Sequence, residues 1–160
     1  MVMTKFDVLL STTVALLFSI SSDVKAQATG RSPFRPRNNI NAYVGLFESN
    51  ISYERNVIQR SKSYSNVRLG FGYGMFYVAG EGKYINAALV HLIGSRSSHL
   101  EIDLGIKYMV TNSIPDPKFS DTVIPDAFLG YRFEGPSGGL IFRAGLSYAT
   151  LVNVGLGYKF

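Results

Sequence analysis

The 160-residue chain contains no cysteine, only two histidines and few charged residues. The absence of cysteine excludes a disulfide scaffold, a thiolate nucleophile and every metal or cluster site that uses cysteine ligands. Two histidines are too few for an imidazole-rich metal centre, so we expect no metal and no cofactor. Charged residues make up 17% of the chain against 46% hydrophobic residues, which argues against an intrinsically disordered chain.

Glycine and aromatic residues are abundant instead. Sixteen glycines, ten tyrosines and eleven phenylalanines favour strands joined by tight turns over helices. The net charge of +5 raises the question of nucleic-acid binding. However, the basic residues form no stripe interleaved with stacking aromatic residues, so we expect no nucleic-acid partner and favour contact with anionic lipid phosphates.

The first part of the chain has the features of an export signal. Lys5 lies in a short basic region, residues 8–20 are mostly apolar, and Val24-Lys25-Ala26 provides a small-x-small cleavage site. The apolar stretch is shorter than the roughly 20 residues that a transmembrane helix needs. The sequence therefore predicts a cleaved signal peptide at 1–26, a basic, proline-containing leader at 27–39 and a β-barrel at 40–160.

From residue 40 onward the apolar residues recur with a period of two. In residues 100–108, Leu100, Ile102 and Leu104 share one face while Glu101 and Asp103 share the other. Similar alternation covers residues 67–75, 126–134, 140–147 and 152–160, and weaker alternation covers 40–48, 50–58 and 84–93. These segments predict eight antiparallel strands, with a first turn at Ser49-Asn50, a long loop at 112–122 and a last turn near Ala149.

The polar face of these strands carries nearly all of their glycines, namely Gly45, Gly70, Gly72, Gly74, Gly105, Gly130, Gly145, Gly155 and Gly157. Glycines on a solvent-exposed face would weaken the strands without benefit, whereas inside a narrow barrel they leave room for large side chains. Aromatic residues lie near the ends of the apolar faces, as at a membrane interface. The predicted fold is therefore all-β, an eight-stranded antiparallel transmembrane barrel, and the alternative is a soluble lipocalin-like barrel that binds an apolar ligand.

The last strand places Val152, Val154, Leu156, Tyr158 and the terminal Phe160 on one face. It looks like the C-terminal signal by which outer-membrane barrels are recognised for insertion. Residues 99–105, 130–133 and 138–145 resemble small bacterial outer-membrane barrels, and the architecture is similar to OmpX and the OmpA membrane domain. The resemblance implies a bacterial outer-membrane location, periplasmic chain ends, contact with lipopolysaccharide or phospholipid, and recognition of the last strand by the barrel-insertion machinery. It leaves the oligomeric state open.

The polar face contains a set of ionisable residues that we expect inside the barrel. These are Glu54, Arg68, Glu101, Asp103, Lys107, Asp126, Arg132, Glu134, Arg143 and Lys159. Acids and bases are equal in number, and the interior of an eight-stranded barrel is just wide enough for its own side chains. We therefore predict a lumen filled by a charge network and a structural role in the cell envelope. A narrow, porin-like pore is the alternative.

One group of residues suggests catalysis. Ser97, His99 and Glu101 lie on one face of a strand, and lipid A deacylases of the outer membrane also use a serine, a histidine and an acid. However, residues two apart on a strand are about 6.6 Å apart and project in parallel, whereas a nucleophile and its base need about 2.6–3.2 Å. The sequence thus favours a protein without enzyme activity, with a lipid-modifying enzyme as the alternative.

Arg55 conflicts with the predicted barrel, because the alternation places it on the outward face. An arginine at the bilayer midplane costs about 2–4 kcal/mol. A β-bulge, a shifted register or extension of the side chain toward the periplasmic rim are three ways to accommodate it.

Overall fold

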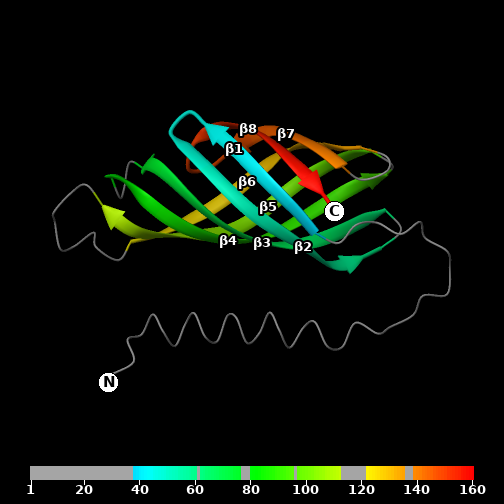
Figure 1. Cartoon of the computed structure of the whole chain (residues 1–160), viewed down its shortest axis with the longest axis horizontal. Helices are drawn as coiled ribbons and strands as arrows, with labels where there is room; N and C mark the ends of the chain where they lie inside the picture. The colour runs from blue at the N-terminus through cyan, green and yellow to red at the C-terminus, as the bar shows by residue number, and fades with distance from the viewer. Residues whose placement is uncertain (1–37, 61, 77–79, 96, 113–121, 136–138) are drawn as a thin grey trace, which may run out of the picture. The chain divides into compact units, whose positions relative to one another are not determined.

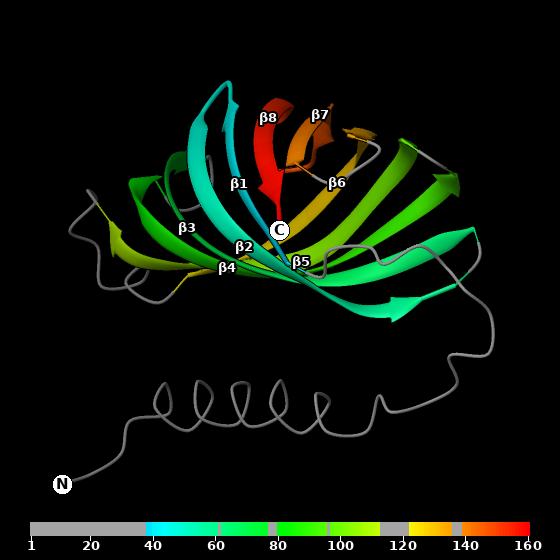
Figure 2. The same ribbon diagram turned by 45° about the vertical axis from the view of Figure 1, so that its right-hand side comes forward.

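The computed structural model describes residues 38–160 apart from 61, 77–79, 96, 113–121 and 136–138. These residues form one closed antiparallel barrel (Figures 1 and 2). The strands are β1 (Asn38–Gly45), β2 (Glu48–Gln59), β3 (Ser63–Phe76), β4 (Gly80–Ser95), β5 (Ser98–Asn112), β6 (Val123–Glu134), β7 (Gly139–Ser147) and β8 (Leu151–Lys159). The predicted fold of eight sequential antiparallel strands is confirmed.

The first and last strands close the barrel. β8 pairs antiparallel with β1, so that Lys159 lies opposite Asn39 and Asn153 lies opposite Gly45. Closure leaves no free edge along the paired strands, and their backbone groups are satisfied within the sheet. Among the described residues, no helix is long and apolar enough to cross a membrane.

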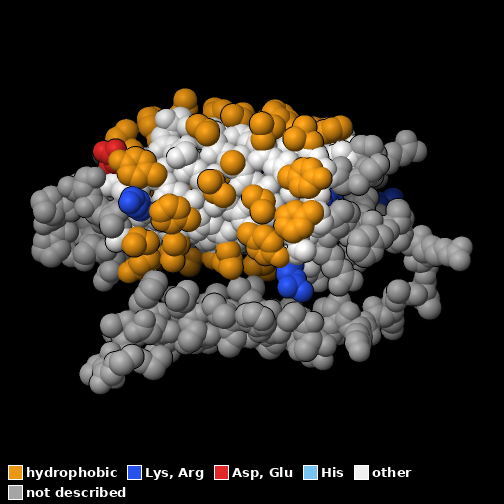
Figure 3. All heavy atoms as spheres, in the orientation of Figure 1, with side chains coloured by type: hydrophobic (Ala, Val, Ile, Leu, Met, Phe, Trp, Pro, Cys, Tyr) orange, Lys and Arg blue, Asp and Glu red, His pale blue; other side chains and the backbone are white. Residues whose placement is uncertain are grey.

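The apolar face of the strands points outward. Leu100 and Leu104 on β5 are 46% and 64% exposed, while Glu101 and Asp103 between them are buried. The same alternation runs along the other strands, so hydrophobic side chains cover the viewed side of the barrel and charged ones lie toward its two ends (Figure 3). The soluble, lipocalin-like alternative requires the opposite polarity and is therefore wrong.

The start of the barrel differs from the expected boundaries. β1 begins at Asn38, two residues before the expected start, and the first turn consists of Leu46 and Phe47 rather than Ser49-Asn50. The reason is that β2 continues its alternation back to Glu48, whose side chain is buried and hydrogen-bonded inside the barrel. Two apolar turn residues carry no glycine or proline signal, which is why the turn was misplaced along the sequence.

The barrel has two distinguishable ends. β1 begins and β8 ends at one of them, together with the β2–β3, β4–β5 and β6–β7 connections, and we call it the terminal end. The other end carries the β1–β2, β3–β4, β5–β6 and β7–β8 connections, and we call it the loop end. The predicted signal peptide, nearly all of the leader and most of the 112–122 loop lie outside the described residues.

Arg55 does lie on the outward face and is exposed. It pairs with Asn38, the first residue of β1, and a register shift between Asn56 and Ile58 follows it directly. Of the three possible accommodations, a bulge is therefore present, but it begins after Arg55 and does not turn this side chain inward.

Candidate functional site: the charged lumen

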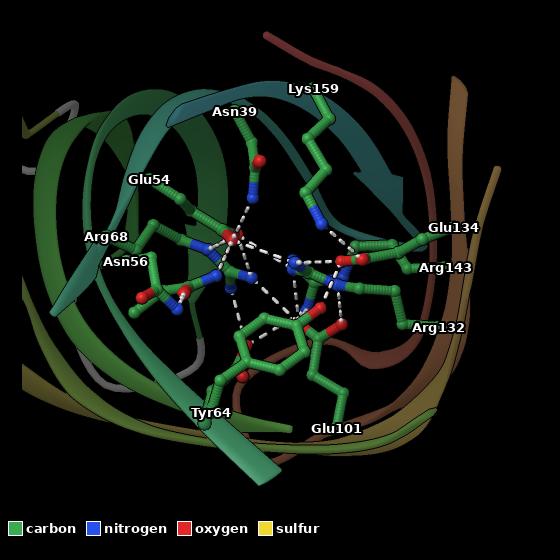
Figure 4. Close-up of polar contacts among 12 residues, drawn as sticks. Asn39, Glu54, Asn56, Tyr64, Arg68, Glu101, Arg132, Glu134, Arg143 and Lys159 are labelled. Carbon is green, nitrogen blue, oxygen red and sulfur yellow. Dashed lines mark hydrogen bonds and ion pairs between the residues drawn. The ribbon is translucent and has the colours of Figure 1, made fainter. Parts of the chain in front are cut away.

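The lumen contains a compact group of three carboxylates and three guanidinium groups, which we call the central cluster. It consists of Glu54, Arg68, Glu101, Asp103, Arg132 and Arg143, all at most 3% exposed. The side chains come from β2, β3, β5, β6 and β7. The five that Figure 4 labels point toward one another across the barrel, namely Glu54, Arg68, Glu101, Arg132 and Arg143. The formal charges of the cluster sum to zero, which is the condition under which buried ions are tolerated.

Arg132 joins the two sides of this cluster. Its Nε and NH2 donate to the Glu101 carboxylate at 2.6 and 3.2 Å. Its NH1 and NH2 donate to the Glu54 carboxylate at 2.9 and 2.8 Å. A planar guanidinium with several fixed donors is suited to such bidentate contacts, and lysine in its place would make fewer of them.

Arg68 binds the three acids of the central cluster. Its guanidinium donates to Glu54 at 2.7 Å, to Glu101 at 2.8 Å and to Asp103 at 2.5 Å. Arg143 completes the cluster through contacts of 3.1 Å to both Glu101 and Asp103. Each carboxylate therefore faces more than one arginine, and the cluster is a network rather than a set of separate pairs.

The network extends to the terminal end of the barrel. Glu134 accepts a hydrogen bond from Lys159 at 2.7 Å and another from the Tyr64 hydroxyl. Tyr64 packs with buried Val90 and Leu92, and its ring meets the His99 ring edge-on at 5.3 Å. At the terminal end of the lumen, charged side chains thus lie beside a group of buried apolar and aromatic side chains.

A second ionic group lies toward the loop end, and Glu48 is its centre. Glu48 accepts hydrogen bonds from Lys107 at 2.6 Å, Tyr84 at 2.8 Å, Thr150 at 3.0 Å and Asn153 at 3.2 Å. Lys107 also contacts Asp126 at 3.1 Å. Buried Phe76, Tyr84, Met109 and Ile124 pack together at this end.

Glu48 was not predicted to lie in the lumen, because the alternation placed it at the end of the first strand, 40–48, directly before the expected turn, whereas it begins β2. A signal was present in the sequence: Glu54, Ser52 and Asn50 alternate on the inward face, and the next residue of this series is Glu48. All ten ionisable residues expected in the lumen do lie on the inward face, nine of them buried and Asp126 partly exposed.

Glycines on the inner face make room for large side chains. A Cβ on Gly145 would come within 2.7 Å of the Phe128 ring and within 2.5 Å of the Gly130 Cα. Phe128 in turn lies under the Arg143 guanidinium, 4.1 Å from ring centroid to carbon, in a cation–π contact. The paired glycines on β6 and β7 therefore position an aromatic ring that supports an arginine of the central cluster.

The three residues considered for catalysis lie close along the chain but have different surroundings. Ser97 is half-buried in the β4–β5 turn, and His99 is buried with its ring against Tyr64. Both oxygens of Glu101 accept hydrogen bonds from arginines. The acid is therefore oriented by the central cluster. No group of three or more histidine, aspartate and glutamate side chains within the described part of the chain is arranged to hold a metal ion.

The outward face of β8 presents the residues that resemble an insertion signal. Val152, Val154, Leu156, Tyr158 and Phe160 are 47–60% exposed along one side of the strand. Phe160 exchanges backbone hydrogen bonds with Asn38, which joins the two ends of the barrel sequence.

Neither protein-family models nor curated proteins match the sequence. Among solved structures, the chain is similar to the outer membrane protein Ail of Yersinia pestis, whose backbone structure was determined in a phospholipid bilayer nanodisc. The two share 14% identity with a TM-score of 0.48, over 78% of this chain and 99% of that one.

Proposed function

We propose that this protein is an integral barrel of the bacterial outer membrane with a structural role in the cell envelope and no catalytic activity. The observation that carries the proposal is the polarity of the barrel. Leu104, Leu140 and Leu146 are each more than 60% exposed on the outside, while charged side chains fill the inside. Water would disfavour so large an apolar surface, whereas acyl chains accept it.

The closed hydrogen-bonding pattern supports the same proposal. A bilayer offers no partners for backbone N–H and C=O groups, so a sheet can cross it only as a closed barrel. The registers from β1 to β8 and back to β1 meet this requirement. Aromatic residues on the outer face near the terminal end, including Tyr131, Phe133 and Tyr158, suit the membrane interface.

A filled lumen supports a structural role over a conducting one. Arg132, Glu54 and Glu101 have no measurable exposure, and their charges are bound to each other. An ion that entered would have to displace these contacts. We further propose that the outward face of β8 is recognised by the barrel-insertion machinery, because its alternate residues end in an exposed terminal aromatic.

Folding into lipid tests this function directly. The purified full chain should insert into phospholipid vesicles and show heat-modifiable migration on gels, and it should produce no stable conductance steps in planar bilayers. Recovery of the folded protein in the aqueous phase without detergent would contradict the membrane location. Reproducible conductance steps would contradict the filled lumen and favour the pore.

A further inference from the structure

A group of basic side chains interrupts the apolar outer surface at the terminal end. Arg55 lies on the outward face of β2, and Arg60 and Lys62 lie in the β2–β3 turn, five and seven positions further along the chain; all three are exposed. Ile58, 52% exposed, lies between Arg55 and this turn on the chain. We call this group the cationic corner. The sheet positions the turn, since the Arg60 N–H donates to Ser63 O at 2.8 Å and the Gly94 N–H donates to Lys62 O at 2.9 Å.

Neighbouring polar side chains extend this corner across three strands. Arg55 lies opposite Val67 on β3, and Ser65 follows two positions further toward the terminal end. Such diagonal neighbours are about 7–8 Å apart, within reach of an arginine side chain. Ser65 lies opposite His91 on β4, and the Ser65 Oγ is 2.9 Å from the His91 Nδ1. Exposed Arg55, buried Ser65 and half-buried His91 thus form a polar row on β2–β4.

The remainder of the outer surface at this end is different. β6, β7 and β8 present Tyr131, Phe133, Phe142 and Tyr158, each at least 43% exposed. Among the described residues, the cationic corner therefore differs from the aromatic surface of β6–β8 at the terminal end, and it is confined to β2 and the β2–β3 turn.

In the part of the chain that the structure describes, no acidic side chain lies on the outer surface at this end. Glu48, Glu54, Glu101, Asp103, Asp126 and Glu134 all belong to the lumen. The remaining described acid, Glu81, lies at the loop end of β4, where the Tyr73 hydroxyl donates to it. The exposed charged side chains described at this corner are therefore all basic, and the partner that complements them is an anion.

The geometry points to an anionic phospholipid whose headgroup phosphate binds between Arg55, Arg60 and Lys62, in the leaflet at the terminal end. This inference rests on the proposed membrane function. Arginine is suited to phosphate because its fork of donors binds two oxygens at once. Leu69 and Leu89, which lie on the loop-end side of this corner, are 40% and 52% exposed and offer apolar contact for the acyl chains. A phosphate partner also explains why an arginine is tolerated on a lipid-facing strand.

Native mass spectrometry of the folded full chain in detergent tests the inference. Cardiolipin, phosphatidylglycerol and phosphatidylethanolamine are titrated separately, and the anionic lipids should bind at least about tenfold more tightly than the zwitterionic one, given the attraction of several basic side chains. The R55Q/R60Q/K62Q variant should lose this preference. The matched control is K83Q, which removes an exposed basic residue at the loop end and should keep it.

The inference is overturned if the triple variant keeps the parent's preference for anionic lipids. It is also overturned if K83Q loses this preference as fully as the triple variant does. Heat-modifiable migration confirms that each variant is folded. The R60Q/K62Q variant changes only the turn, so it provides a second measurement if the triple variant does not fold, and it should lose part of the preference. A parent protein that inserts into no vesicle refutes the proposed function itself, whereas insertion without headgroup preference refutes only this inference.

Discussion

Replacing Arg132 by methionine tests the energetic role of the central cluster. Arg132 is fully buried and donates four hydrogen bonds to the carboxylates of Glu54 and Glu101. Methionine has a similar length but no donor, so the variant leaves three carboxylates facing two arginines in a closed interior. Removing one partner from a buried ion pair costs about 3–5 kcal/mol, and we expect R132M to lower the free energy of unfolding by that amount.

The chain has no tryptophan, so unfolding in urea is best followed by far-UV circular dichroism and by gel migration. R55M is the matched control, because it removes the same side chain from the outer face. Near the interface an arginine costs about 0–1 kcal/mol, so R55M in zwitterionic vesicles should be neutral or slightly stabilising.

A second substitution separates loss of packing from loss of charge. In the R132M background, E101Q removes one of the carboxylates that lost its partner, and we expect it to recover part of the stability. In the parent, E101Q should be destabilising, because there it breaks contacts with Arg68 and Arg132. If the free energy of unfolding of R132M lies within about 1 kcal/mol of the parent value, the cluster does not stabilise the barrel as a buried ionic network should, and the reasoning is refuted.

E48Q should lower the free energy of unfolding by about 1–3 kcal/mol in the same urea assay, because Glu48 accepts four buried hydrogen bonds and its charge faces Lys107. G145A should lower the free energy of unfolding by about 1–3 kcal/mol, because the added methyl group overpacks against Phe128. An unchanged urea midpoint would contradict this close packing. F160A should slow insertion into vesicles that contain the insertion machinery more than it lowers final stability, which refolding time courses on gels would show.

The composition of the lumen was predictable because strand periodicity is local. Alternate side chains of a strand point to opposite faces, so the series from Leu100 to Lys107 assigns Glu101 and Asp103 to one face without knowledge of any other strand. The accumulation of glycine on that same face indicated which side is crowded, and the exposed Leu100 and Leu104 agree with it. The first turn was not predictable in the same way, since Leu46 and Phe47 have no turn chemistry.

What the sequence by itself determined is therefore the strand count, the two faces and ten of the charged residues inside, Glu48 being the one that was not predicted. Only the tertiary structure decided which charge meets which. Arg132 reaches from β6 to Glu54 on β2, and Glu48 on β2 meets Lys107 on β5. These contacts cross the lumen between strands that do not pair, so they depend on the register of every strand pair and on closure of β8 against β1. The alternation within one strand carries no information about the registers between strands. For this physical reason the sequence predicted which charged residues lie inside but not which of them form pairs.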